Sequence, residues 1–219
     1  IYPPTLDAGK LAEKYDVLVL ESGIIPSQAL GGGFGQPQQR PDPETIPPEY
    51  RARMGAVSQD KTIPQLRQFL ADGGTILAIG GSTSLGYAAG LPIANALVEA
   101  GTPKPLPPEK FYVPGAVFRV RVDTSHPLAY GVPEQLDIFY DNNPVFRLKP
   151  GAGVQRVAWF DSDKPLRSGW AWGQNYLKDG VTVIDAQVGN GRLLLFGPLI
   201  AFRAHPHGTF KFLFNGVYY

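Results

Sequence analysis

"TIPQLRQFLADGG" (62–74) runs directly into "TILAI" (75–79), and these two stretches decide the fold. Four apolar residues of the first stretch share one helical face: Ile63, Leu66, Phe69 and Leu70. Thr62 stands before this pattern as the expected N-cap, and Gly73 follows it as the expected stop. "TILAI" and the upstream "DVLVL" (16–20) are continuous apolar runs, typical of parallel strands buried on both faces. Strand, helix and strand predict a crossover unit of an α/β fold.

The second half of the chain is rich in strand patterns. They are "AVFRVRVD" (116–123), "LDIFYD" (136–141), "VQRVAWF" (154–160) and "VTVIDAQVGNGRLLLFG" (181–197). The Gly-Asn-Gly inside the last one predicts a hairpin. Thr209 is expected to cap a final helix that packs through Phe210, Leu213, Phe214 and Val217. We therefore expect an α/β sheet with a β-rich addition.

Composition excludes several classes of function. The chain of 219 residues, 43% of them hydrophobic, fits a single domain over 1–219. A net charge of +1 without a basic stripe argues against a nucleic-acid partner, and no apolar run is long enough to predict a membrane span. The absence of cysteine excludes disulfides, thiolate nucleophiles and cysteine-type zinc sites.

Because the chain starts at Ile1, we interpret it as a piece of a longer protein. The Gly- and Pro-rich stretch from 23 to 57 fits either a functional flap or a surface loop.

"LAIGGSTSLGYAAGLP" (77–92) follows the strand at 75–79, where open α/β sheets place their sites. Its Gly80-Gly81-Ser82-Thr83-Ser84 matches the first three positions of the nucleophile elbow G-x-S-x-G. The catalytic candidates are therefore Ser82 or Ser84, with His205 or His207 as the base. The alternative is a turn that only joins strand to helix.

The histidines lack the spacings of a zinc site. His126 is followed by "PLA" and His205 by "PHG", whereas catalytic zinc sites often use H-x-x-E or H-E-x-x-H. We predict no metal in this chain. Pro206 stiffens the segment between His205 and His207, so we expect both imidazoles to hold a loop.

"PLRSGWAWGQNYL" (165–177) is the most informative stretch for binding. Its candidate ligand-binding residues are Arg167, Trp170, Trp172 and Gln174. In the proposed arrangement, an indole ring stacks on a sugar or an aromatic group of the ligand, while Arg and Gln supply planar hydrogen bonds. The alternative is that the tryptophans pack under the loop. In "FYDNNPVF" (139–146), Asp141 and Asn142 either reach a ligand or close a turn.

Several segments carry a family resemblance. The strand, turn and helix over 75–97, with "HPH" near the end, resemble a class I glutamine amidotransferase. The position of that family's cysteine falls near Ser82, and the glutamate of its His-Pro-Glu corresponds to His207.

A closer resemblance covers most of the chain. Its segments are "FYVPGAVFRVRVDTSHPLAYG" (111–131), "FYDNNPVFRL" (139–148), "RVAWFDSDKPLRSGWAWGQNYL" (156–177) and "PHGTFKFLFNGVYY" (206–219). They resemble the amidotransferase-like C-terminal region of large bacterial zinc carboxypeptidases of the carboxypeptidase A family. The resemblance implies a flavodoxin-like, three-layer fold and a parent enzyme that is secreted or periplasmic. It also implies that the first strand and helix of the fold precede Ile1, and that zinc belongs to the parent peptidase domain only. The zinc-binding H-x-x-E of that family is missing here.

Three hypotheses follow. The favoured one is a non-catalytic amidotransferase-like accessory domain without a cofactor of its own, which binds a small ligand, a peptide or its own peptidase domain. The second is a serine or metal-assisted hydrolase that uses Ser82 or Ser84 with His205 or His207. The third is a carbohydrate-binding domain similar to the trehalose-utilisation branch of the same fold.

Overall fold

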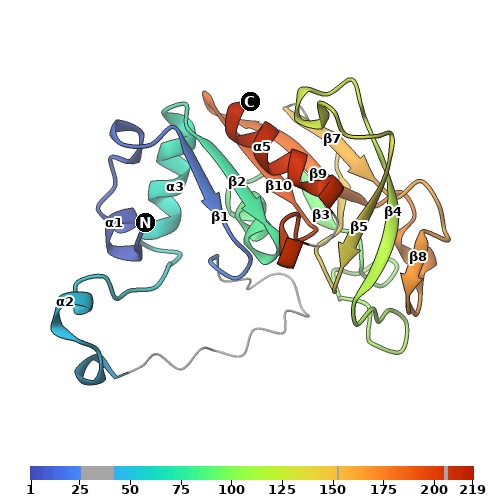
Figure 1. The fold of residues 1–219 in the computed structure, drawn as a ribbon, viewed down its shortest axis with the longest axis horizontal. Helices are drawn as coiled ribbons and strands as arrows, with labels where there is room; N and C mark the ends of the chain where they lie inside the picture. Colours follow the sequence, from blue (N-terminus) through green and yellow to red (C-terminus); the bar gives the residue numbers. More distant parts are fainter. Residues whose placement is uncertain (26–41, 152, 205–206) are drawn as a thin grey trace.

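A computed structural model describes residues 1–25, 42–151, 153–204 and 207–219 (Figure 1). Its strands are β1 Val17–Leu20, β2 Thr75–Ile79, β3 Ile93–Asn95, β4 Ala116–Val122, β5 Gln135–Tyr140, β6 Phe146–Leu148, β7 Val154–Trp159, β8 Leu166–Gly169, β9 Val181–Val188 and β10 Gly191–Phe196. Its α-helices are α1 Pro3–Asp7, α2 Pro48–Arg51, α3 Thr62–Ala71, α4 Leu85–Ala88 and α5 Phe210–Tyr218. No helix in these ranges is long and apolar enough to cross a bilayer.

The described strands join into one mixed sheet, with the order β1-β2-β10-β9-β7-β4-β5 along its main path. β1 and β10 both pair with β2 in parallel, so the crossover predicted from 16–79 is confirmed. β9 and β10 pair antiparallel around Gly189 and Asn190, which confirms the predicted hairpin. β4 and β5 pair antiparallel at the far end of the sheet, and β8 pairs with β4 beside them. The sheet therefore has a parallel part next to α3 and an antiparallel part that ends at β5 and β8 (Figure 1).

Helix α3 confirms the predicted apolar face, with the residues Ile63, Leu66, Phe69 and Leu70 all buried. The helix ends before Gly73, whose φ of +104° is the left-handed conformation that glycine adopts most easily. The N-cap prediction was wrong, because Lys61 holds that position. The Thr62 hydroxyl instead donates to a carboxylate oxygen of Asp7 and accepts from the backbone N–H of Ser58. It thereby joins α3 to the N-terminal segment.

Strand β1 departs from the expectation of burial on both faces. Leu18 and Leu20 are buried, whereas Val19 is 42% exposed. β1 is the terminal strand of the order along the sheet, and Val19 faces away from α3. Strand β2, which lies between β1 and β10, keeps Ile76, Leu77 and Ala78 fully buried.

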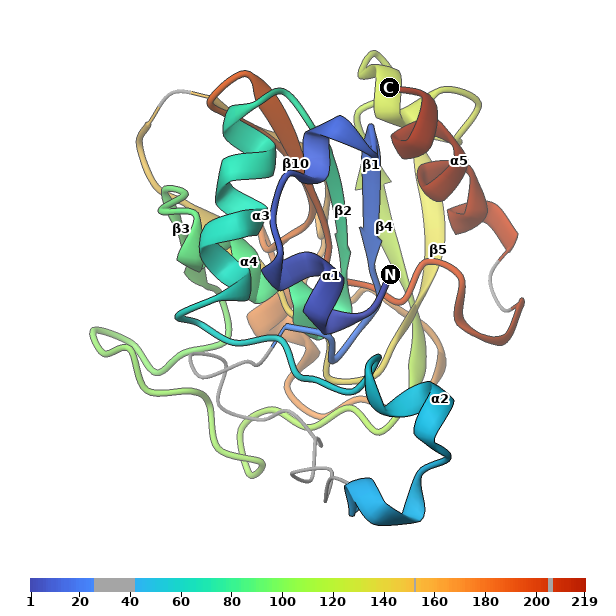
Figure 2. The same cartoon turned by 90° about the vertical axis from the view of Figure 1, so that its left-hand side faces the viewer.

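Helix α5 covers the face of the sheet opposite to α3 (Figure 2). The predicted packing face was partly wrong: Leu213 packs against the core, but Phe214 is 60% exposed and Val217 is 40% exposed. Phe212 and Gly216 face the sheet instead. A Cβ on Gly216 would lie 2.8 Å from Leu77, so the missing side chain lets α5 approach β2 closely.

Thr209 stands at the N-cap of α5 without a side-chain cap bond to the helix. Its buried hydroxyl donates to the carbonyl of Ile200. The predicted cap position is confirmed, but the hydroxyl ties the helix start to the segment after β10.

Candidate functional site

Gly80 is the first residue after β2 and the residue on which the turn depends. Its φ is +57°, in the left-handed region, and a Cβ there would lie 2.5 Å from Ser22 Oγ. In a nucleophile elbow the strained residue after the strand carries the nucleophilic side chain. Here that place is held by a residue without a side chain, with no room for one.

Ser82 and Ser84 lie in the 3₁₀ turn Gly80–Ser84 that follows β2. Ser82 is fully buried. Its hydroxyl donates to the carbonyl of Glu21 and accepts the backbone N–H of Ile25 at 3.2 Å. Both bonds join this turn to the segment after β1, so the hydroxyl proton faces a carbonyl rather than a base. Ser84 is 7% exposed, and no partner for its Oγ is found in the described part of the chain.

The structure brings neither described histidine to these serines. His205 lies outside the described residues. His207 is exposed, and its ring centroid lies 5.3 Å from that of Phe210. His126 is buried near the start of β10, whereas Ser82 follows the end of β2. Within 1–25, 42–151, 153–204 and 207–219, no group of three or more His, Asp or Glu side chains has a metal-binding arrangement.

A buried charged cluster that sequence reasoning missed surrounds Asp185 on β9. Arg192 Nη1 lies 2.6 Å from Asp185 Oδ2, and His126 Nε2 lies 3.2 Å from the same oxygen. The contact with His126 has the distance of an ion pair without the angle of a good hydrogen bond. His126 Nδ1 accepts the backbone N–H of Leu128 at 3.2 Å, so the ring's own proton belongs on Nε2, toward Asp185.

Tyr219 completes this cluster. Its ring lies 4.0 Å from the Arg192 guanidinium carbon, and burial followed by the charge of Asp185 raises the pKa of its hydroxyl. Arg192 stands opposite Thr75, the first residue of β2, so the cluster lies at the end of the parallel strands away from Gly80. A signal was present in the sequence: Asp185 is a lone charge within an apolar strand. The cluster ties β9 and β10 to the His126 loop and to Tyr219 at the end of α5.

Three aromatic side chains form a surface that we call the aromatic platform: Tyr112, Trp170 and Trp172. Their exposed fractions are 37%, 53% and 55%. Tyr112 precedes β4, and the tryptophans follow β8. Both tryptophans are half exposed, so they do not pack under the loop.

Gln174 and Arg167, the other two candidate ligand-binding residues of 165–177, are held by contacts of their own. Gln174 Oε1 accepts the backbone N–H of Leu166 at 3.1 Å, so this amide holds the loop closed. Arg167 is half exposed on β8, with its Nε 3.9 Å from Asp137 on β5. Asp137 is already bound in bidentate fashion by Arg119, at 2.8 and 3.1 Å.

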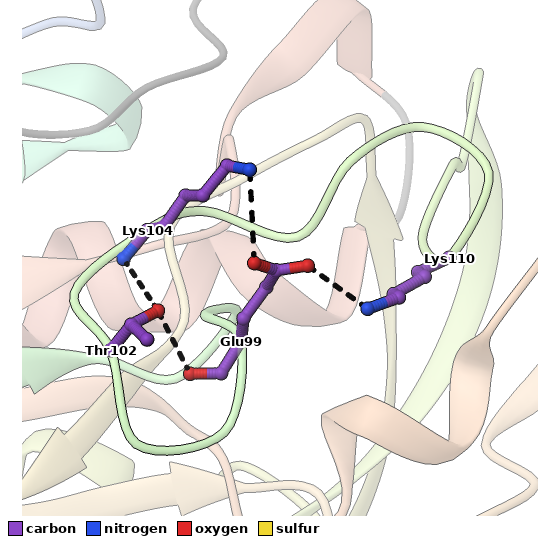
Figure 3. A network of polar contacts seen from close by, with 4 residues as sticks. All are labelled: Glu99, Thr102, Lys104 and Lys110. Atoms are coloured by element: carbon purple, nitrogen blue, oxygen red, sulfur yellow. Dashed lines mark hydrogen bonds and ion pairs between the residues drawn. The ribbon is translucent and has the colours of Figure 1, made fainter.

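The network around Glu99 holds the segment that leads to the platform (Figure 3). Lys110 Nζ lies 2.9 Å from one carboxylate oxygen of Glu99, and Lys104 Nζ lies 3.8 Å from the other. The hydrogen bond from Lys110 and the charges of both lysines lower the pKa of Glu99. The backbone carbonyl of Glu109, the residue before Lys110, accepts the indole N–H of Trp172 at 2.7 Å. The Glu99 network and this bond together fix the Trp172 ring.

Asp141 and Asn142 close a turn after β5. Asn142 has a φ of +47°, and the backbone N–H of Asp141 donates to Asn143 Oδ1 at 2.8 Å. Asn142 Nδ2 lies 3.4 Å from Asp141 Oδ1. These contacts account for both residues as turn formers.

Two surface hollows lie away from the serines. One of about 510 Å³ runs along α3 beside Arg67 and Ala71. The other, of about 490 Å³, lies beside Tyr87 and Glu99. Neither is lined by Ser82 or Ser84.

No family model matches the sequence, and no curated protein matches it either. Among solved structures, a GMP synthase protein from Thermoplasma acidophilum matches with a TM-score of 0.50 and 11% identity, over 95% of this chain and 74% of that one. The chain has a class I glutamine amidotransferase-like fold. The expected α/β, flavodoxin-like architecture is thereby confirmed.

Two further solved structures match this amidotransferase-like domain less well. A ThuA-like protein from Bacteroides uniformis ATCC 8492 has a TM-score of 0.44 and 11% identity, over 96% of this chain and 72% of that one. A β-galactosidase from Bacillus circulans sp. alkalophilus has a TM-score of 0.42 and 13% identity over 71% of this chain. The domain spans only 20% of that enzyme's length.

Proposed function

We propose that this amidotransferase-like domain is non-catalytic and serves as a binding domain. The observation that supports this most strongly is the turn after β2. Gly80 occupies the strained position, and Ser82 is buried with its hydroxyl bonded to backbone groups. Acyl transfer at this turn needs an exposed nucleophile and a base within hydrogen-bond reach. The described residues supply neither.

The sequence resemblance supports a further part of the proposal. The segments over 111–131 and 156–177 resemble the region that follows the catalytic domain of bacterial zinc carboxypeptidases. On this basis we propose that the domain accompanies such a peptidase in a secreted or periplasmic protein, and that zinc is held by the peptidase domain. The coding sequence upstream of Ile1 tests this: a peptidase domain with H-x-x-E is expected there, and an unrelated domain would remove the support for the association.

The hydrolase alternative is tested by direct assay. We expect the purified domain to hydrolyse neither glutamine nor p-nitrophenyl acetate above the buffer rate. Ser82→Ala and Ser84→Ala are compared with Ser168→Ala, which changes an exposed serine on β8. Turnover that disappears in Ser82→Ala or Ser84→Ala, but persists in Ser168→Ala at an equal melting temperature, would establish a serine hydrolase and refute the proposal.

The carbohydrate-binding alternative is favoured by one specific observation, the two half-exposed tryptophans of the aromatic platform. It is compatible with a non-catalytic domain, because binding needs no nucleophile.

A further inference from the structure

We infer that the aromatic platform, together with Arg167, binds a carbohydrate chain whose sugar rings pack on Trp170 and Trp172. This inference rests on the proposed binding function and names its ligand class.

The backbone places the three rings on one face. Tyr112 and Trp172 exchange both backbone hydrogen bonds, at 3.1 and 2.9 Å, so they stand directly opposite each other as an antiparallel pair. Side chains of such a pair point to the same side. Trp170 stands two residues before Trp172, and its ring centroid lies 6.0 Å from that of Tyr112. Tyr112 therefore stands beside both tryptophans on one surface.

The Trp172 ring is held in place before any ligand binds. The indole N–H of Trp172 is bound to the Glu109 carbonyl, and Gly173 beside it has a φ of +76°. A Cβ on Gly173 would lie only 2.0 Å from the carbonyl oxygen of Lys110, so the two segments are in close contact. The planes of Tyr112 and Trp170 meet at 62°, which forms a corner rather than a flat stack. The fixed Trp172 ring beside this corner lowers the entropy cost of holding a cyclic ligand.

Hydrogen-bond donors surround these rings without partners of their own. In the described part of the chain, neither the Trp170 indole N–H nor the Tyr112 hydroxyl has a hydrogen-bond partner. Arg167 shares Asp137 with Arg119, whose two bonds already occupy both carboxylate oxygens. The 3.9 Å between Arg167 Nε and Asp137 is longer than a hydrogen bond, so the planar donors of Arg167 can bind a ligand.

This combination of aromatic rings and hydrogen-bond donors suits a carbohydrate. A sugar ring has an apolar C–H face and a rim of hydroxyls, which match an aromatic face bordered by N–H and O–H groups. The large apolar side chains exposed along 109–113 and 165–177 are all aromatic, each with a polar atom: Tyr112, Trp170, Trp172 and Tyr176.

The test is affinity gel electrophoresis of the purified domain through gels that contain xylan, β-glucan, galactomannan, glycol chitin or polygalacturonate. We expect at least one polysaccharide to retard the protein. Trp170→Ala and Arg167→Ala should each weaken this retardation at least tenfold in apparent Kd, and Trp170→Phe should restore part of it. Tyr130→Ala is the matched control, because Tyr130 is an aromatic residue with 81% exposure outside the platform.

Three outcomes would overturn the inference. They are no retardation by any of the five polysaccharides, retardation that Trp170→Ala leaves unchanged, and retardation that Tyr130→Ala weakens equally. A proline-rich peptide that quenches Trp170 fluorescence, when no polysaccharide retards the domain, would assign the platform to peptides instead. None of these results changes the outcome of the hydrolysis assay. An experiment that rules out a carbohydrate ligand can therefore be distinguished from one that shows the domain to be catalytic.

Discussion

Replacing Asp185 by alanine should destabilise this domain more than the same change at Asp137. Both carboxylates lie on strands and accept hydrogen bonds from an arginine of a neighbouring strand. They differ in burial, because the side chain of Asp185 is 5% exposed and that of Asp137 is 41% exposed. Their arginine partners are about equally exposed, at 35% for Arg192 and 38% for Arg119, so the comparison isolates the burial of the carboxylate.

The expected loss of stability depends on which charged or polar groups each substitution leaves without a partner. Asp185→Ala leaves the Arg192 charge and the Nε2 proton of His126 without their shared acceptor. Arg192 is 35% exposed and stays partly solvated, whereas His126 is buried. The expected loss is therefore about 1–3 kcal/mol, the cost of leaving buried polar groups without a partner. Asp137→Ala exposes Arg119 to water, which solvates it, so the expected loss is about 0–1 kcal/mol.

Urea unfolding followed by tryptophan fluorescence measures both free energies of unfolding. The reasoning holds if the midpoint of Asp185→Ala falls clearly below that of Asp137→Ala with an unchanged slope. Equal losses for the two variants would refute it, because burial of the carboxylate would then make no difference.

Two further predictions concern tyrosine hydroxyls. Tyr140 is fully buried with no partner for its hydroxyl among the described residues, so Tyr140→Phe should leave the free energy of unfolding unchanged or raise it by up to about 1 kcal/mol; a clear drop in melting temperature would contradict this. Burial raises the pKa of Tyr87 from 10.0 to about 12. Below pH 10 this hydroxyl is protonated in both the folded and the unfolded chain, and its contribution to the free energy of unfolding is complete. As the pH rises from 10 toward 12, only the unfolded chain loses the proton, so the folded state loses stability. Urea midpoints measured across this range should fall less steeply for Tyr87→Phe than for the wild type, and equal slopes would show that Tyr87 stays unperturbed.

Local patterns were reliable where a single element carries the information. The face of α3, its stop at Gly73 and the hairpin at Gly189 and Asn190 followed directly from residue spacing and turn chemistry. The apolar run of β2 also identified a strand buried within the sheet. In each case the decisive residues lie within about a dozen positions of one another, so the physical cause is local.

Sequence patterns failed where contacts with residues distant in sequence determine which side of an element is buried. In α5, Phe210, Leu213, Phe214 and Val217 formed a plausible apolar face, but contact with Leu77 through Gly216 rotates the helix so that Phe212 is buried. Four apolar residues and one glycine allow more than one orientation of a short helix. Only the shape of the sheet beneath it selects one.

The candidate site likewise has some features that could be predicted from the sequence and others that could not. Residue identity and spacing were enough to single out Trp170 and Trp172 as a binding surface to test, and to show that no cysteine is present and that the elbow pattern is incomplete. The folded chain was needed to show that Tyr112 joins the tryptophans and that Ser82 is buried against Glu21. It was also needed to show that Asp185 has Arg192 and His126 as partners. Such contacts join residues that can be up to 60 or so positions apart, and chain closure over that length is driven by burial of the whole core rather than by any local preference.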